Sequence, residues 1–369
     1  SNMRVNKRTI WIILFIQLLK LHVIMCYFGL AARDLILPVT LGYQVNIDDR
    51  LANNRLPSSK KLCDMLVLEK KQRRMCKRGK GIAKSLLESI RLSVFECGYQ
   101  FQYERWNCSS DDQYRMNILR REFKETSFLY AISSASLVNT FARECSRGSI
   151  DRCTCDESKN LKNKEAWLWG GCGDNIKYGL KFTRKFLKYS KRRGKDIRAK
   201  VDEHNSRLGR KIVRDKVKTT CKCHGVSGSC TVQTCWRQLS PFHVIGQLLK
   251  DKYESSFKVV TYTNQATGKS HLVKRLKESQ DISEESSAPK TGDMVYLEDS
   301  PNFCTASKYS PGTVGRTCQK GINCDVMCCG RGYNVKSVTV KSACQCQVHW
   351  CCYVECKQCM NEEEIYMCK

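Results

Sequence analysis

Cysteine is the residue that most constrains this chain, because it occupies 25 of the 369 positions. Such a density indicates either many bound metal ions or folding in an oxidising compartment where disulfides form. Structural zinc sites use repeated C-x-x-C or Cys/His pairs. The close pairs here are mainly C-x-C and adjacent C-C, and the chain has six histidines. We therefore expect disulfides and no metal.

The cysteines fall into two groups of equal size. Twelve lie between positions 63 and 235, twelve lie between positions 304 and 368, and none lies in residues 236–303. Both counts are even, so each group can close its own bridges. This predicts two domains, 33–262 and 299–369. The segment between them, 263–298, is rich in Ser, Lys and Glu towards its end, as in a flexible linker.

The first 32 residues have the pattern of a signal peptide. Arg4, Lys7 and Arg8 precede an apolar run at 10–19 that is shorter than a membrane span. Cleavage after this run would remove Cys26 and leave 24 cysteines. An uncleaved anchor is the alternative, because residues 21–30 are apolar too. We expect cleavage and a secreted protein.

The first half of the chain has helical periodicity. Ile82, Leu86, Ile90 and Val94 recur at intervals of four, which places them on one face of a helix. Further helices are expected at 121–145, at 176–189 and, after a proline start signal, at 242–253.

The second half predicts a different kind of structure. It has 12 cysteines in the 66 residues from position 304 onward and few apolar side chains to bury. Disulfides must then replace a core, and short β-prone runs favour narrow hairpins. The expected class is α+β and disulfide-rich, with a mostly helical N-terminal domain and a small C-terminal domain of β-hairpins.

The chain carries a formal net charge of +28. Residues 181–220 alone hold 16 Lys and Arg against 4 Asp and Glu, a net +12. Outside the cell, sulfated glycosaminoglycans and acidic lipid headgroups are the abundant polyanions. We expect heparan sulfate proteoglycans as partners and no nucleic acid. The alternative is a solvated face with no partner.

A short loop, CHGVSGSC at 223–230, is surrounded by cysteines. The simplest pairing joins Cys221 with Cys235 and Cys223 with Cys230 as nested bridges, although sequence alone leaves the connectivity open. Glycines on both sides of Ser227 permit positive φ and leave its hydroxyl uncrowded. The pattern predicts a stiff hairpin over 221–235 that presents one serine.

Three roles for Ser227 are compatible with this pattern. It is an incidental turn residue, a hydrolase nucleophile, or an acceptor that another enzyme modifies. The nucleophile elbow G-x-S-x-G requires a glycine where Ser229 stands, and it lies between a strand and a helix. The neighbouring His224 does not by itself make a base. We favour the third role, in which Ser227 is an acceptor that another enzyme modifies.

The segment CKCHGVSGSCTVQTCW at 221–236 resembles the signature of the Wnt family of secreted, lipid-modified signalling glycoproteins. The resemblance continues, in order and spacing, over nearly everything from Cys63 to the end. The matching segments are ECGYQFQYERWNCS (96–109), FLYAISSASL (128–137), ECSRGSIDRCTCD (144–156), WGGCGDNIKYG (169–179), SPNFC (300–304), CCGRGYN (328–334) and CQCQVHWCCYVECKQC (344–359).

This resemblance implies a morphogen-type ligand that is not an enzyme. Ser227 would carry a monounsaturated fatty acyl chain, added by the acyltransferase Porcupine, and Wntless would carry the product. The ligand would act in the extracellular space and matrix, associated with membranes through its lipid. The alternatives are a secreted lipid-active hydrolase and a heparin-binding growth factor that uses Ser227 otherwise.

The family binds the cysteine-rich domain of Frizzled receptors at two places, and a co-receptor related to the low-density-lipoprotein receptor takes part. One place is the acylated loop, and the other is a C-terminal finger. A vicinal disulfide at its tip, beside two aromatic rings, would make a rigid apolar knob; the alternative for Trp350 is burial beneath the hairpin. The implied contact residues are Gly225, Val226, Ser227, Gly228, His349, Trp350, Cys351, Cys352, Tyr353 and Val354.

The resemblance also implies further bridges and a glycosylation site. Asn107 begins the sequon Asn-Cys-Ser, where the family is often N-glycosylated. Cys63 and Cys76 remain once all the other pairs are assigned, and we expect them to bond to each other. The other implied pairs are Cys97 with Cys108, Cys145 with Cys153, Cys155 with Cys172, Cys304 with Cys329, Cys318 with Cys324, Cys328 with Cys368, Cys344 with Cys359, Cys346 with Cys356, and Cys351 with Cys352.

Overall fold

The computed structural model describes residues 58–66, 68–108, 112–156, 172–188, 197–231, 233–263, 270–275, 288–349 and 353–369. The expected signal peptide, 1–32, lies outside these residues. The chain forms two compact units: Ser1–Gln100 with Asp111–Ser300, and Phe101–Ser110 with Pro301–Lys369. In the part of the chain that is described, no helix is both long and apolar enough to cross a membrane.

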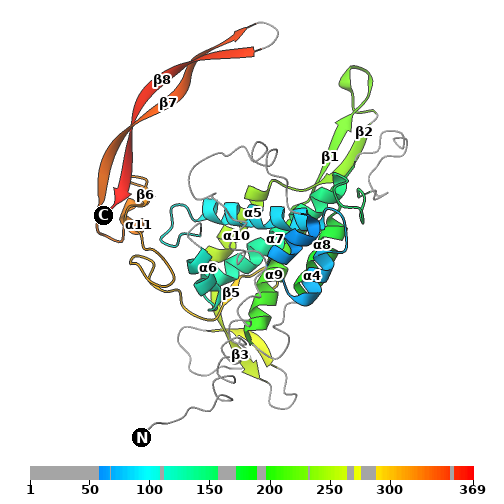
Figure 1. Ribbon diagram of the computed structural model, residues 1–369, viewed down its shortest axis with the longest axis horizontal. Coiled ribbons are helices and arrows are strands. Elements are labelled where there is room, and N and C mark those ends of the chain that lie inside the picture. The colour runs from blue at the N-terminus through cyan, green and yellow to red at the C-terminus, as the bar shows by residue number, and fades with distance from the viewer. Residues whose placement is uncertain are drawn as a thin grey trace. The chain divides into compact units, whose positions relative to one another are not determined.

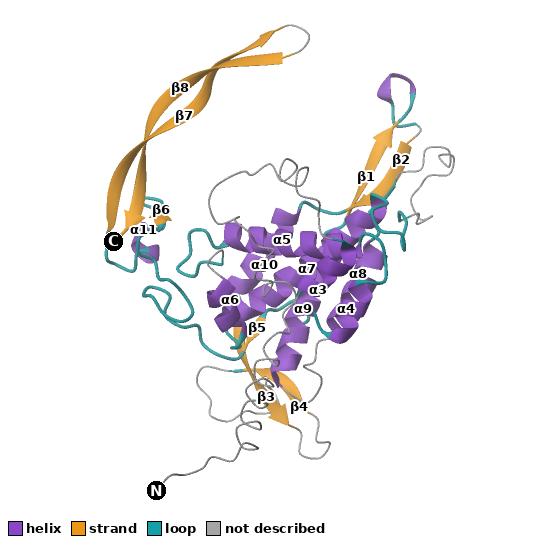
Figure 2. Cartoon of the chain, viewed as in Figure 1, coloured by secondary structure: helices purple, strands orange, loops and turns teal. Residues whose placement is uncertain are grey.

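The first unit is a bundle of helices with two small sheets (Figures 1 and 2). Helices are present at all four places where the sequence predicted them. The helices are α3 (Ser59–Met65), α4 (Lys70–Cys76), α5 (Ile82–Gln100), α6 (Asp112–Leu119), α7 (Lys124–Ser146), α8 (Ile176–Lys188), α9 (Ile197–Asp215) and α10 (Phe242–Glu254). The strands are β1 (Lys218–Cys223), β2 (Gln233–Gln238), β3 (Phe257–Thr263), β4 (Ser270–Lys274) and β5 (Val295–Tyr296).

Helix α7 is the centre of this bundle. It packs against α5, α8, α9 and α10, and it is buried almost all round, as a core helix should be. Glycines bring two neighbours unusually close to it. A Cβ on Gly209 of α9 would lie 2.0 Å from the carbonyl oxygen of Ala131, and one on Gly179 of α8 would lie 2.6 Å from that of Val138.

Helix α9 lies in the basic run and was not predicted. Its buried apolar side chains are Val201, Leu208 and Val213, and the polar Asp202, Asn205, Ser206 and Arg210 are buried beside them. Charged residues interrupt this narrow apolar stripe, so the sequence of α9 is typical of a solvated segment. One face of the helix nevertheless packs on α7.

The expected linker at 263–298 is wrong at both ends. Strand β4 pairs antiparallel with β3, and β5 pairs with β3 in parallel. Val295 is fully buried, in a cluster with Val201 and Val259. The burial of these apolar side chains outweighs the polar composition of the segment, so its ends belong to the first unit. Residues 276–287 lie outside the described part.

One buried amide holds β5 in place. Asn205 donates from Nδ2 to the carbonyl oxygen of Val295 at 2.9 Å, and its Oδ1 accepts from the Val295 N–H at 3.1 Å. Ser127 of α7 donates to the same carbonyl at 2.7 Å. These bonds satisfy a backbone that would otherwise be buried without partners.

We expect Asn205→Ala to destabilise the first unit by about 2–4 kcal/mol, because the backbone N–H and the carbonyl oxygen of Val295 each lose a buried hydrogen-bond partner. The loss lowers the thermal midpoint by roughly 5–12 °C, measurable by scanning calorimetry. Arg207→Ala, at an exposed position of the same helix, is the control. Equal midpoints for the two variants would contradict this role of Asn205.

The second unit is held together by disulfides around a small core. Its elements are β6 (Thr317–Cys318), α11 (Cys324–Met327), β7 (Tyr333–His349) and β8 (Tyr353–Cys368), in sheet order β6-β8-β7. The core contains Cys318, Cys324, Met327, Cys328 and Cys368, with Tyr333 and Tyr366 packed against it. The predicted hairpin is present as one long pair, β7 and β8.

Ten residues from an earlier part of the chain belong to this second unit. Arg316 donates to the carbonyl oxygens of Gln102, Glu104 and Arg105, at 3.0, 2.6 and 2.9 Å. Burial lowers the pKa of the Arg316 guanidinium from its ordinary value. The predicted domain boundaries missed this segment, because nothing local in residues 101–110 indicates a partner more than 200 positions away.

Candidate functional site

The hairpin formed by β1 and β2, which we call the thumb, projects from the helical bundle (Figure 1). Its strands pair antiparallel from Lys218 opposite Gln238 to Cys223 opposite Gln233. Cys221 and Cys235 face each other in this register and are bonded, and Cys223 is bonded to Cys230. Two nested bridges therefore clamp the thumb, in the simplest of the pairings that the sequence left open.

The thumb ends in a tight turn that carries Ser227. The residue has φ 55° and ψ 28°, in the left-handed region, and Gly228 follows at φ 75°. Backbone bonds close the turn, from Gly228 N–H to the Gly225 carbonyl at 3.0 Å and from Ser229 N–H to the Val226 carbonyl at 3.1 Å. Ser227 is exposed, and within the described residues its hydroxyl has no hydrogen-bond partner.

Gly225 allows the turn to close. A Cβ at this position would lie 2.1 Å from Ser229 Oγ and 2.5 Å from the Ser229 carbonyl oxygen. The neighbouring Val226 is 90% exposed. The four residues that the family resemblance singled out in the loop therefore lie together at the tip of the thumb.

Asp174 anchors the base of the thumb to the bundle. Its carboxylate accepts from Leu239 N–H, just after β2, at 2.8 Å, and from Ser146 Oγ, at the end of α7, at 3.0 Å. Its own N–H donates to the Arg237 carbonyl at 2.9 Å. Because β2 is bonded to the central helix in this way, the thumb is a rigid extension of the bundle.

Strands β7 and β8 form the second projection, which we call the finger (Figure 2). They pair from Tyr333 opposite Cys368 to His349 opposite Tyr353. One extra residue lies in β7 between Cys344 and Gln347, where Gln345 has φ 44°. The bridges Cys344 with Cys359 and Cys346 with Cys356 join the strands around this bulge.

The described end of the finger is apolar and exposed. Tyr353 is 62% exposed and Val354 57% exposed. His349 stacks on Tyr353, with ring centroids 5.0 Å apart, and its Nε2 lies 3.2 Å from a carboxylate oxygen of Glu355. Trp350, Cys351 and Cys352, and the bridge expected between the two cysteines, lie outside the described residues.

The sequence analysis did not identify Val348, which is 80% exposed and pairs across the finger with Val354. Strand pairing could have indicated it, because residues at equal distances from a hairpin tip face each other. It adds a third exposed apolar side chain to the finger end.

The remaining expected bridges agree with the structure wherever it describes them. Cys97 and Cys108 are each disulfide-bonded. Asn107 is half-buried, and Ser109 of its sequon lies outside the described residues. The other observed pairs are Cys63 with Cys76, Cys145 with Cys153, Cys155 with Cys172, Cys304 with Cys329, Cys318 with Cys324, and Cys328 with Cys368.

Comparison with known proteins agrees with this architecture. The profile of the wnt family matches residues 64–369. The chain belongs to the Wnt family. Protein Wnt-9a of Gallus gallus is 54% identical to it over 345 residues, which cover 93% of this chain and 94% of the relative. Protein Wnt-9b of Homo sapiens is 49% identical over 343 residues, 93% of each chain.

A solved Wnt structure confirms the fold class. The structure of human WLS in complex with WNT8A matches with a TM-score of 0.56 and 34% identity, and the match covers 78% of this chain and 94% of that one. The expected α+β, disulfide-rich fold is therefore confirmed. As a Wnt, the chain is a secreted signalling ligand.

Proposed function

We propose that this Wnt carries a monounsaturated fatty acyl chain on Ser227 and binds the cysteine-rich domain of a Frizzled receptor through its thumb and finger. The observation that carries the proposal is the exposed Ser227 hydroxyl at the tip of a hairpin clamped by two disulfides. Ordering such a loop costs little when a partner binds it, because its conformation is set beforehand.

The modification is an acyl transfer from a thioester to an alcohol. Ser227 Oγ attacks the thioester carbonyl, the C–O ester bond forms as the C–S bond breaks, and the hydroxyl proton leaves with the thiol. No oxidant or reductant is needed. The acceptor must reach into a membrane acyltransferase of the Porcupine type, and the exposed tip formed by Val226, Ser227 and Gly228 suits that access.

The acyl chain supplies most of the binding energy in this proposal. Each buried methylene contributes about 0.8 kcal/mol, so a chain of roughly sixteen carbons offers on the order of 10 kcal/mol to an apolar groove. The same apolar chain needs shelter during transport. Since a related Wnt was solved in complex with WLS, we propose a Wntless carrier for this chain, and association with membranes through the lipid.

The finger provides the second contact. Val348, Tyr353 and Val354 are exposed apolar side chains at its described end, and such side chains on a rigid support are typical of interface anchors. We assign His349, Trp350, Cys351 and Cys352 to the same contact.

We further propose that Ser227 is an acceptor and that the chain has no hydrolase activity. His224 is directed at β2, where its Nε2 lies 3.1 Å from Thr234 Oγ1. The turn around Ser227 is flanked by strands, and a nucleophile elbow requires a following helix.

Three further features belong to the proposal. Asn107 carries an N-glycan, a co-receptor related to the low-density-lipoprotein receptor completes the signalling complex, and the basic charge of residues 181–220 attracts heparan sulfate proteoglycans.

Intact-peptide mass spectrometry of the secreted protein tests the acyl proposal directly. The peptide that contains Ser227 is expected to carry the mass of a monounsaturated acyl chain, released by mild alkali as an ester. An unmodified Ser227 in a protein that signals at full strength would show that the thumb is only a rigid hairpin.

We expect Gly225→Ala to reduce this acylation severely. The added methyl group collides with Ser229, so the turn must open and Ser227 moves from the position that the two bridges set. Val226→Ala is the matched control, because that side chain is exposed and adds nothing to the turn. The measured quantity is the acylated fraction of Ser227; equal fractions in both variants would contradict the requirement for glycine.

A further inference from the structure

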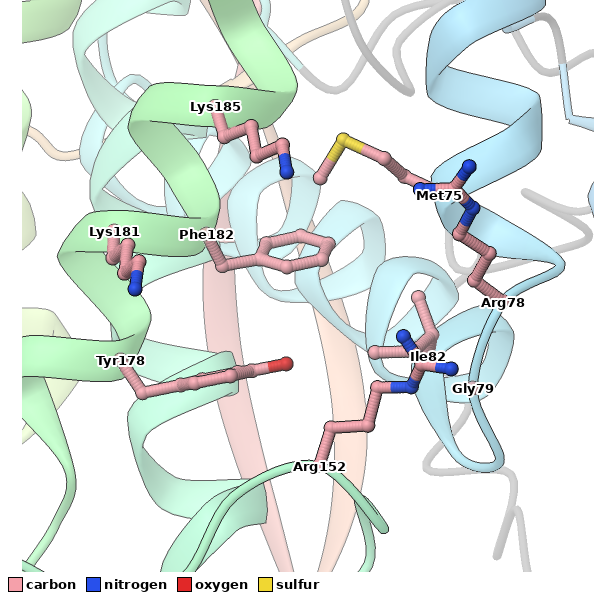
Figure 3. Close-up of a pocket in the computed structure, with 9 residues that line it drawn as sticks. All are labelled: Met75, Arg78, Gly79, Ile82, Arg152, Tyr178, Lys181, Phe182 and Lys185. Carbon is pink, nitrogen blue, oxygen red and sulfur yellow. The ribbon is translucent and has the colours of Figure 1, made fainter.

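A pocket of about 310 Å³ lies in the first unit, among α4, α5, α8 and the loop after α7 (Figure 3). Apolar side chains form its floor: Met75, Ile82 and Phe182, with the ring of Tyr178 beside them. Neither the acyl chemistry of Ser227 nor the finger accounts for this pocket.

The pocket is lined by four cations. Lys181 and Lys185 are one turn apart on α8, Arg78 follows α4, and Arg152 comes from the loop after α7. All four residues are exposed, and none makes a salt bridge with any residue that the structure describes. One carboxylate, Asp151, lies beside the pocket, where its Oδ1 would be 3.0 Å from a Cβ on Gly79. Against four cations it leaves the local charge positive.

The rim and the floor are held rigidly. Cys153, next to Arg152, is bonded to Cys145 of α7, and Cys76, two residues before Arg78, is bonded to Cys63. On the floor, the ring of Phe182 stacks on that of Phe141 at 3.8 Å. Cations that converge on a preformed site lose little entropy on binding an anion.

Tyr178 adds a neutral hydrogen-bond donor. Its hydroxyl points into the pocket (Figure 3), and burial raises the pKa of the phenol above its ordinary value. The group therefore stays protonated at neutral pH and can donate to a sulfate oxygen, while the ring offers an apolar face.

We propose that this pocket is the primary docking site for a sulfated sugar residue of a glycosaminoglycan chain. A sulfate group lies among the four cations, where Arg forks and Lys ammonium groups make charge-assisted hydrogen bonds. The C–H face of the sugar ring packs on Tyr178 and Phe182. The inference rests on the proposed attraction to heparan sulfate and names where on the chain it acts.

A polymer fits this surface better than a single lipid headgroup does. The basic surface continues along α8 beyond the pocket, through the exposed side chains of Lys177 and Arg184. A chain with a sulfate on successive sugars can follow it, whereas one headgroup would leave these cations unused.

Affinity for a heparin octasaccharide tests the site. We compare full-length wild-type protein with K181A/K185A and with K60A/K252A, a control that removes the same charge from residues outside the pocket lining. The pocket variant is expected to bind on the order of tenfold more weakly, with a shallower salt dependence, and the control less than about twofold more weakly. Equal losses would mean that net charge alone drives binding and would overturn the site.

Lysine acetylation read by mass spectrometry gives an independent test. The octasaccharide is expected to protect Lys181 and Lys185 and to leave Lys60 and Lys252 reactive; uniform protection would overturn the assignment. If wild type does not bind heparin at all, the glycosaminoglycan partner itself fails, and the acyl and receptor proposals are unaffected.

Vesicles containing phosphatidylserine separate the two sources of anion. If K181A/K185A loses binding to these vesicles and keeps its affinity for heparin, the pocket recognises lipid headgroups and the proposal is overturned. We expect the reverse pattern, with heparin affinity lost and vesicle binding, carried by the acyl chain, retained.

Discussion

Ser227→Ala is expected to leave the fold intact and to remove most of the protein's affinity for its receptor. Alanine has the same Cβ as serine, so the left-handed conformation at φ 55° costs the turn no more than it does now. The loss is the acyl chain, which contributes on the order of 10 kcal/mol before the costs of binding. We expect receptor affinity to fall at least about a hundredfold, and secretion to fall with it.

Ser229→Ala is the matched control for this experiment. Its hydroxyl is exposed on the same thumb two residues away, and its one hydrogen bond among the described residues is with Thr231 Oγ1, at 3.1 Å. Binding to an isolated Frizzled cysteine-rich domain should be measured at equal concentrations of folded protein. If the two variants bind alike, the acyl chain does not reside on Ser227.

The second large effect is expected at the finger. Tyr353→Ala combined with Val354→Ala removes two exposed apolar side chains next to the tip. Interface anchors of this kind each contribute about 1–2 kcal/mol or more, so receptor affinity should fall roughly thirtyfold or more. Folding should not change, because neither side chain supports a core.

Val335→Ala combined with Met360→Ala controls for the removal of exposed apolar area. These residues are 54% and 70% exposed on the same two strands, away from the tip. The control should keep full affinity in the same binding assay. A loss shared by both pairs would mean that the finger binds along its length, and a loss in neither would exclude the tip as a contact.

The sequence predicted best what is determined locally. The thumb lies within 21 residues, from Lys218 to Gln238. Its glycines and paired cysteines favour the hairpin independently of how the rest of the chain folds. The helices α5 and α7 were also predictable, since their apolar spacing is a local signal.

Features that depend on distant partners could not be predicted. Val295 of strand β5 is buried against Val201 and Val259, and Asn205, 90 positions earlier, binds its backbone. The polar residues around β5 in the sequence favoured a linker. The bulge at Gln345 shifts the register of the finger by one residue, which no local composition shows. The pocket gathers cations from three separate elements, so only the fold reveals it.

The bonds from Arg316 to Gln102, Glu104 and Arg105 limit how a Wnt chain can be divided into fragments. Residues 101–110 fold with the C-terminal unit although the chain on both sides of them folds with the first. A fragment that starts at residue 301 would lack the three carbonyls that Arg316 binds, so its guanidinium would lose these acceptors. Chimaeras that exchange C-terminal units between Wnt paralogues must therefore exchange this earlier decapeptide as well, at two additional junctions.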